Sequence, residues 1–493
     1  MAADREENLL LEKVYYENCP GCRQDRIKEN KPGIPFKAFF FVWAVQLCTA
    51  LPISSLFPFV YFMIRDFHIA KTEHDIGYYA GFLAASFMIG RALTSILWGI
   101  AADRYGRKPI ILLCTISVLV LPRKCMVIFN TLFGLSTSFW MAISMRFLLG
   151  CFNGLVGPIK AYATEICRKE YQPLALSIIS TARGLSYIIG PVIGGFLAQP
   201  AEKYPSVFSK NSLFGRFPYL LPCVCVSLFA LGVTIASLWF PETLHMHNMK
   251  GREEFSSYDA SNSDMKESVE GTEGCESASE GSLLKNWPLM SSITVYCIFA
   301  LHDMAYAEIF SLWAVSPRKD GGLSFSSKDV GVVLAISGLG LILFQLFVYP
   351  VVEKSFGPIM VSRIAAFMSV LLLSSYPIIS MLSGLGLSII LTSASMLKNI
   401  LSVMIITGMF ILQNNAVPQN QRGAANGISA TAMSIFRAIG PAGGGALFSW
   451  SQKRQNAAFL PGDQMVFFVL NVVELIGALL TFKPFLDLPD RQV

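Results

Sequence analysis

The sequence predicts an all-α polytopic membrane protein in which twelve transmembrane helices form two six-helix halves. Three observations predict this class. Hydrophobic residues make up 53% of the 493 residues and charged residues only 15%, whereas a soluble chain usually carries about 25% charged residues. Twelve apolar segments reach the roughly 20 residues that a helix needs to cross a bilayer. One long polar interval separates the first six segments from the last six.

Each expected span is a mainly apolar run between polar turns. The first six cover residues 38–64, 77–101, 110–136, 139–162, 172–198 and 218–240. The last six cover residues 290–315, 329–352, 359–384, 387–413, 424–450 and 463–487. The charged tail at 1–37 lacks the apolar core of a signal peptide, so we expect the first span to act as the insertion signal. The expected domains are this tail, a first half at 38–240, a linker at 241–287, a second half at 288–487 and a tail at 488–493.

Clusters of lysine and arginine in short turns predict the orientation. Arg104, Arg107 and Lys108 follow the second span, and Arg168 and Lys169 follow the fourth. Since short loops rich in Lys and Arg face the cytosol, both termini and the linker are expected there. The longer outer loop "AEKYPSVFSKNSLFGRF" is basic as well, so the orientation rests on the majority of the loops.

The two halves are separated by a polar linker and repeat each other's features. The linker, residues 241–287, is acidic and serine-rich without apolar periodicity, which predicts a disordered segment. Gly190, Pro191, Gly194 and Gly195 in the fifth span are echoed by "GPAGGG" in the eleventh. The Gly-Pro pair predicts a helix bend, and the glycines predict close helix packing. Two such halves with a site between them are typical of secondary transporters.

The turn after the second span carries the most specific motif. "GIAADRYGRKP" resembles the loop between the second and third helices of the major facilitator superfamily, and this implies the major facilitator fold. The matching residues are Gly99, Asp103, Arg104, Gly106 and Arg107. The resemblance implies that Asp103 and Arg107 pair with neighbouring helix ends and help to latch the two halves in one state.

Other motifs narrow the resemblance. Arg146 in "MRFLLGCFNG" matches the arginine of the fourth span, and "GLSYIIGPVIGG" matches the fifth-span pattern of the proton antiporters. "CPGC", "PETLHMH", "GPIKAYATEI" and "NQRGAANGIS" resemble the plant zinc-induced facilitator-like family. The resemblance extends over nearly the whole chain.

The seventh span contains three ionisable residues, His302, Asp303 and Glu308, in "FALHDMAYAEIF". A charge in a span costs roughly 2.5–3.5 kcal/mol on insertion scales, so each is a candidate for proton coupling. His302 and Tyr306 share a helix face, and Tyr306 is a candidate cavity residue. Glu308 lies about 140° around the helix from Asp303, so the two carboxylates need not face one cavity. The alternative is a structural carboxylate paired with Arg91 or Arg437.

Arg146 is the fourth candidate for proton coupling. It lies in line with Gly150, Asn153 and Gly157, a face of small residues that lets helices approach or lines a cavity. Arg91 and Asn153 are further candidates to line that cavity. For both arginines, structural pairing is the alternative.

Four residues outside the spans have zinc-ligand chemistry. Cys19 and Cys22 are spaced as ligands in "CPGC", and His245 and His247 begin the linker on the same expected side. Together they predict a cytosolic Zn²⁺ site; a redox pair, or no site at all, remains open. We expect no other cofactor. No segment matches GxxxxGK[ST], so ATP-driven transport is not expected.

The third span departs from the family pattern. Pro122, Arg123 and Lys124 interrupt its apolar run, and removing residues 121–128 restores a length close to the roughly 20 that a bilayer needs. An insertion that distorts this span is therefore expected, and it could impair transport.

These observations predict a proton-coupled secondary transporter that works by alternating access, and no enzyme. The family resemblance implies an antiporter that exports small organic solutes, including metal chelators such as nicotianamine and phytosiderophores, across the plasma or vacuolar membrane. Its expected partners are the solute, protons and the lipid bilayer, with no nucleic acid and no second subunit. The alternatives are a monovalent cation/proton exchanger and a non-transporting membrane metal sensor; the charges retained inside the spans argue against the sensor.

Overall fold

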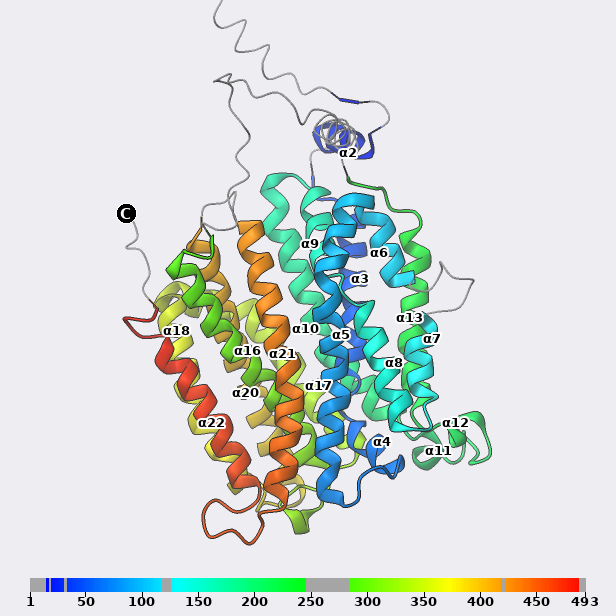
Figure 1. Ribbon diagram of the computed structural model, residues 1–493, viewed down its shortest axis with the longest axis vertical. Helices are drawn as coiled ribbons and strands as arrows, with labels where there is room; N and C mark the ends of the chain where they lie inside the picture. The colour runs from blue at the N-terminus through cyan, green and yellow to red at the C-terminus, as the bar shows by residue number, and fades with distance from the viewer. Residues whose placement is uncertain are drawn as a thin grey trace, which may run out of the picture.

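The computed structural model describes residues 15–16, 19–30, 33–116, 126–244, 283–417 and 422–486. Every regular element within these ranges is a helix, and the long helices run side by side as a bundle of two halves (Figure 1). This confirms the expected all-helical, twelve-span architecture.

The first half contains six spans, of which three are interrupted. They are α3 (Phe36–Ser54) with α4 (Val60–Asp66), α5 (Ile76–Tyr105), α6 (Arg107–Ile116) with α7 (Met126–Gly134), α8 (Phe139–Cys151) with α9 (Val156–Glu165), α10 (Gln172–Leu197) and α13 (Leu220–Ser237). The expected insertion in the third span lies largely in residues 117–125, outside the described residues.

The second half also contains six spans. They are α16 (Trp287–Val315), α17 (Ser327–Leu343) continued by η4 (Phe344–Val348), α18 (Tyr349–Ser374) with the short α19 (Tyr376–Ile379), α20 (Gly384–Asn415), α21 (Arg422–Gln452) and α22 (Asp463–Leu480). Gly357, at φ 73°, breaks α18 into the end of the eighth span and the start of the ninth.

Length and apolarity alone qualify seven of the described helical segments as membrane spans. The third and fourth spans fall short because each is divided into two shorter helices, for instance α6 with 10 residues and α7 with 9.

The bundle has two distinct ends. The tail end carries the short helix α2 (Pro20–Asn30) and the start of α3, at the top of Figure 1. The far end carries α4 and the two short helices α11 (Pro200–Lys203) and α12 (Leu213–Arg216).

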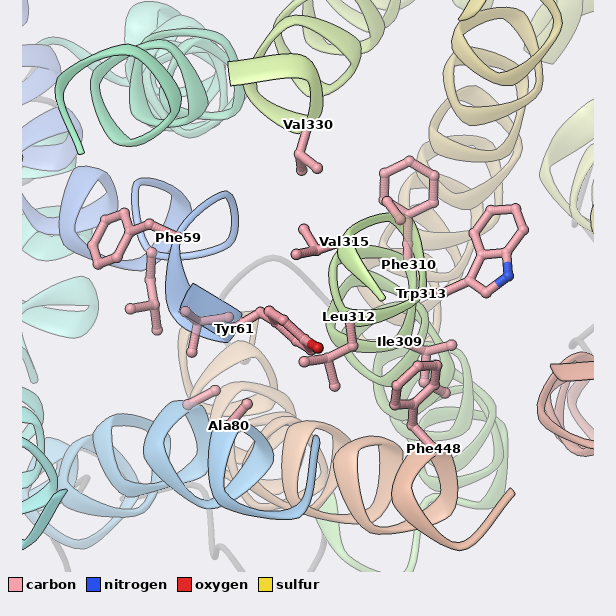
Figure 2. Packing of buried hydrophobic residues seen from close by; sticks show 14 of the residues in the cluster. Phe59, Tyr61, Ala80, Ile309, Phe310, Leu312, Trp313, Val315, Val330 and Phe448 are labelled. Carbon is pink, nitrogen blue, oxygen red and sulfur yellow. The ribbon is translucent and has the colours of Figure 1, made fainter. Parts of the chain in front are cut away.

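The apolar core joins the halves at the far end. One cluster of buried side chains combines Phe59 and Ala80 of the first half with Leu312, Trp313 and Phe448 of the second (Figure 2). Two other clusters, nearer the tail end, each belong to one half alone. The burial of apolar surface therefore favours a bundle that is closed at its far end.

Two glycine crossings bring the halves together. A Cβ atom at Gly195 of α10 would lie 2.8 Å from the Cα atom of Gly331 of α17. A Cβ atom at Gly445 of α21 would likewise lie 2.8 Å from the Cα atom of Gly81 of α5. Neither backbone contact could form with a larger residue. The glycine pattern of the fifth span thus serves close packing; α10 runs as one helix through Pro191, and the expected bend stays a prediction.

Candidate transport site and gates

The loop between α5 and α6 is built around one carboxylate. Gly106 has φ 112°, and a Cβ atom there would lie 2.5 Å from Glu242 Oε2, so glycine is required on both counts. The backbone N–H groups of Arg107 and Lys108 donate to Glu242 at 2.9 and 3.0 Å. Glu242 therefore caps the N-terminus of α6, where the helix dipole favours negative charge.

Arg107 ties this loop to the end of the fourth span. Its guanidinium donates to Glu165 at 3.1 and 3.2 Å and forms an ion pair with Asp103. Burial by itself lowers the pKa of Arg107, but the two carboxylates outweigh burial and the pKa is raised. Arg104 stays at the surface, over the ring of Tyr105. The partners of the loop belong to the first half and to the start of the linker. The expected pairing with helix ends is therefore present, while latching of the two halves stays a prediction.

Polar contacts between the halves gather at the far end. Lys203 Nζ donates to Gly195 O and to Ser327 Oγ, each at 2.6 Å, and so joins α10 to α17. Burial lowers the pKa of Lys203 to about 8. In addition, two lysines of the second half form ion pairs with acidic residues of the first half. Lys319 pairs with Glu73 at 3.2 Å, and Lys453 pairs with Asp75 at 2.6 Å.

Three arginines lie near the middle of helices that pack at the interface of the halves. Arg91 lies near the middle of α5, Arg183 near the middle of α10 and Arg437 near the middle of α21. Their charges repel one another, and Lys160 of α9 adds to the same field. Because α5 packs on α21 and α10 packs on α17, this group lies at the interface of the halves. Like charges that act on one another in this way favour an anionic partner.

Asp303 is an acidic residue near this group, since it and two of the arginines act on the same tyrosine, Tyr187. It is partly exposed and accepts a hydrogen bond from Ser402 Oγ of α20. Its charge acts on Tyr187 of α10, and so do the charges of Arg183 and Arg437. Within the described residues, no direct ion pair joins Asp303 to Arg91 or Arg437. The structure therefore does not pair the Asp303 carboxylate with Arg91 or Arg437, which was the structural alternative to proton coupling.

Arg146 and Glu308 lie apart from Asp303. Arg146 is 2% exposed, donates to Pro52 O at 2.9 Å and lies 5.0 and 5.2 Å from the ring centroids of Phe87 and Phe133. Glu308 is fully buried, and its charge interacts with Arg146 across the interface of the halves. The two carboxylates of α16 therefore have different surroundings, as their spacing predicted.

Arg146 also has a structural role. The last carbonyl groups of a helix have no donor within the helix, and Arg146 supplies one at the end of α3. Asn153 also contacts the backbone of α3, further inside the helix, donating to Thr49 O at 3.0 Å. The expected cavity face of the fourth span thus holds α3 in place at these two residues, while Gly157 is exposed with no atom near its would-be Cβ.

His302, a candidate for proton coupling, and Tyr306, a candidate cavity residue, make their contacts inside the second half. His302 Nδ1 is 2.8 Å from Glu474 Oε2 of α22. The Tyr306 hydroxyl bonds to the Tyr376 hydroxyl at 2.7 Å. The helical period showed that His302 and Tyr306 share a face, but the period does not tell which neighbour that face packs against.

Two cations were missed in the sequence. Lys398, at 1% exposure, lies over the ring of Tyr306 with Nζ 5.3 Å from the centroid. Arg183, in the fifth span, is the second, and it belongs to the central arginine group. The rule that marks any charge inside a span as a functional candidate would have found both.

The expected zinc site is only half described. Cys19 and Cys22 are buried at α2, and the Gly21 N–H donates to Leu244 O at 3.1 Å, which brings the start of the linker to the "CPGC" turn. His245 and His247 lie outside the described residues. Among the residues that are described, no group of three or more His, Cys, Asp or Glu forms a metal site. The zinc site stays a prediction.

A two-half helical bundle with charged residues at its central interface defines a secondary transporter. Residues 42–441 match the Major Facilitator Superfamily, and the chain belongs to this family of transporters rather than to any class of enzyme. It is 60% identical over 484 residues to Protein ZINC INDUCED FACILITATOR-LIKE 1 of Arabidopsis thaliana, covering 98% of this chain and 99% of the relative. Protein ZINC INDUCED FACILITATOR 1 of the same plant is 59% identical over 494 residues, covering 100% of both chains.

The fold is also similar to solved structures. The crystal structure of a D-xylose-proton symporter matches with a TM-score of 0.66 and 13% identity, over 91% of this chain and 97% of the other. These findings confirm the family resemblance and an integral, multi-pass membrane protein that carries small molecules.

Proposed function

We propose that the protein is a proton-coupled antiporter that exports small organic anions, metal chelators among them, from the cytosol by alternating access. The observation that carries the proposal is the group of Arg91, Arg183 and Arg437 at the middle of the interface between the halves. The recorded acid there is Asp303. An excess of positive charge in a poorly hydrated site is stabilised by an anionic ligand, and arginine binds carboxylates through paired hydrogen bonds.

Chelators of divalent metals fit this chemistry because they carry several carboxylates on a small body. The names of the two plant relatives connect those proteins with zinc, which supports a role of this chain in zinc or iron homeostasis. The plasma membrane and the vacuolar membrane are the proposed locations, and the transporter works as a monomer.

Alternating access follows from the way in which the halves are joined. The far end is closed by the shared core, the glycine crossings and the Lys203 contacts. With the basic turns and the tails in the cytosol, this closed end faces away from the cytosol and the arginine group is loaded from the cytosolic side. Opening the far end then releases the anion.

Asp303 is proposed to carry the proton that exchanges for the anion. Antiport requires that the proton and the anion cross in separate steps. We therefore propose that Asp303 is ionised while the anion is bound, since three arginines and one carboxylate still leave an excess of positive charge for the anion. Asp303 takes up a proton at the far end after the anion has left, and releases it to the cytosol before the next anion binds.

Monovalent cation/proton exchange is the second candidate. The positive centre of the interface disfavours a cation as cargo, since like charges repel more strongly where water is scarce. The two candidates therefore predict cargo of opposite charge.

Purified protein in sealed proteoliposomes separates them. With a pH gradient imposed, radiolabelled nicotianamine should accumulate, and replacing Arg183 by Gln should reduce this accumulation while leaving the fold intact in a melting assay. Accumulation of potassium or rubidium in place of the chelator would establish the second candidate. Failure to move either cargo, with the protein folded, would leave the sensor alternative.

A further inference from the structure

A second group of buried ionisable side chains lies inside the second half, away from the central arginines. His302 of α16, Lys398 of α20 and Glu474 of α22 are each 1% exposed. His302 Nδ1 is 2.8 Å from Glu474 Oε2, and the charges of both His302 and Lys398 act on Glu474. The transport proposal uses none of these three contacts.

The described surroundings of the group are polar, and Asp303, next to His302, acts on Tyr306 at its edge. Ser369 of α18 faces Glu474, Ser395 of α20 faces Tyr306, and Tyr306 bonds to Tyr376 of α19. Lys398 Nζ and His302 Nε2 have no hydrogen-bond partner within the described structure. Two donors that are buried and unpaired in one compartment cost free energy, and such a compartment is suited to exchange protons or hold water.

The charges in this compartment cannot all be balanced at once. Glu474 neutralises one positive charge, whereas His302 and Lys398 can each carry one. A charge that is buried without a partner is strongly destabilising, so the compartment is neutral with one of the two bases protonated. One further proton makes it positive, with the imidazolium and the ammonium sharing a single carboxylate.

We propose that His302, Lys398 and Glu474 form a proton-binding site inside the second half, separate from Asp303, in which His302 takes up and releases the proton. Glu474 favours the protonated imidazole, and Lys398 opposes it by competing for the same carboxylate. The site therefore has two charge states that differ in how strongly α16 and α20 are held to α22.

The position of this site connects it to the central interface. His302 and Asp303 are consecutive on α16, and Lys398 lies one helical turn from Ser402 on α20. Ser402 donates to Asp303. A shift of α16 against α20 that follows protonation of His302 therefore moves the hydrogen bond on Asp303 as well.

Histidine NMR on the full-length protein in lipid nanodiscs tests proton binding directly, without substrate or gradient. The chain has five histidines, and the His302 signal is the one that disappears in His302→Gln. Its chemical shift should change as the sample is taken from about pH 5 to pH 8, the range in which histidines in general change charge. A signal that stays unchanged over this range would overturn the proposal.

Two variants test the assignment of the partners through opposite effects. Glu474→Gln should weaken proton binding at His302 by about tenfold or more, and Lys398→Met should strengthen it by a similar factor, as expected for charges within about 4–6 Å. If a single variant does not fold, the double variant Glu474→Gln/Lys398→Met keeps the compartment uncharged, and His302 should then stay neutral. If His302 binds protons with equal affinity in all folded variants, the group is only a structural contact. This result would not depend on whether the transport proposal is correct.

Discussion

The crossing of α10 and α17 offers a way to open the far end by adding volume. In Gly195→Leu the new Cβ atom would lie 2.7 Å from Ser327 O and 2.8 Å from the Gly331 Cα atom. Ordinary contacts of a Cβ atom begin near 3.4 Å, and both neighbours are backbone, so the helices themselves must separate.

The size of the effect follows from the cost of overpacking. Forcing extra methylene groups into a close contact costs about 1–3 kcal/mol. Because this penalty acts only while the far end is closed, it shifts the equilibrium towards the open state by about 5- to 150-fold.

Cysteine labelling from the far side measures this shift. Ser311, fully buried, donates to Phe57 O across the halves, so Ser311→Cys becomes reachable only when the far end opens. Gly195→Leu should raise its labelling rate by a membrane-impermeant maleimide. Gly232→Leu is the matched control, because no atom lies within 4 Å of the would-be Cβ of Gly232 on α13. Equal labelling of the two variants would refute the closing role of the crossing.

Three further predictions follow from the site and the third span. Asp303→Asn should keep the fold, since the amide oxygen still accepts a hydrogen bond from Ser402. It should abolish chelator uptake driven by a pH gradient while sparing downhill exchange of the chelator. If this variant still concentrates the chelator, another residue carries the proton, and Glu308 is the next candidate. Burial in the closed state lowers the pKa of Lys203 to about 8, below the roughly 10.4 of an exposed lysine, so between these pH values the open state binds more protons than the closed state. The closed state should therefore become more stable as pH rises through this window, and labelling of Ser311→Cys by maleimide should fall. Lys203→Gln should remove this pH dependence. Deleting residues 121–128 removes an interior proline that costs about 3 kcal/mol and two cations that cost roughly 2.5–3.5 kcal/mol each. The folded yield in a detergent melting assay should therefore rise. A lower yield would contradict the expected insertion.

Sequence patterns predicted the features that depend only on residues close together in the chain. The apolar runs predicted the twelve spans, and the cations Arg104, Arg107 and Lys108 between two of these runs predicted a charged turn. The partners of that turn, Glu165 and Glu242, could not be identified because they are brought there by packing between helices far apart in the chain.

The candidate site was predicted less fully for the same reason. Helical spacing separated Asp303 from Glu308, but it could not show that His302 and Tyr306 face α20 and α22 rather than the central interface. The meeting of Arg91, Arg183 and Arg437 depends on three helices from both halves, and no pattern within one helix contains it.

Proton exchange driven by the anion alone is the most direct test of the account. Proteoliposomes loaded with a pH-sensitive dye and held without a pH gradient should become alkaline inside when nicotianamine enters down its own gradient, because each anion that enters is exchanged for protons that leave. Asp303→Asn should abolish this pH change while nicotianamine still exchanges. Acidification of the interior, which indicates symport, or chelator entry without any pH change, would contradict the proposed antiport.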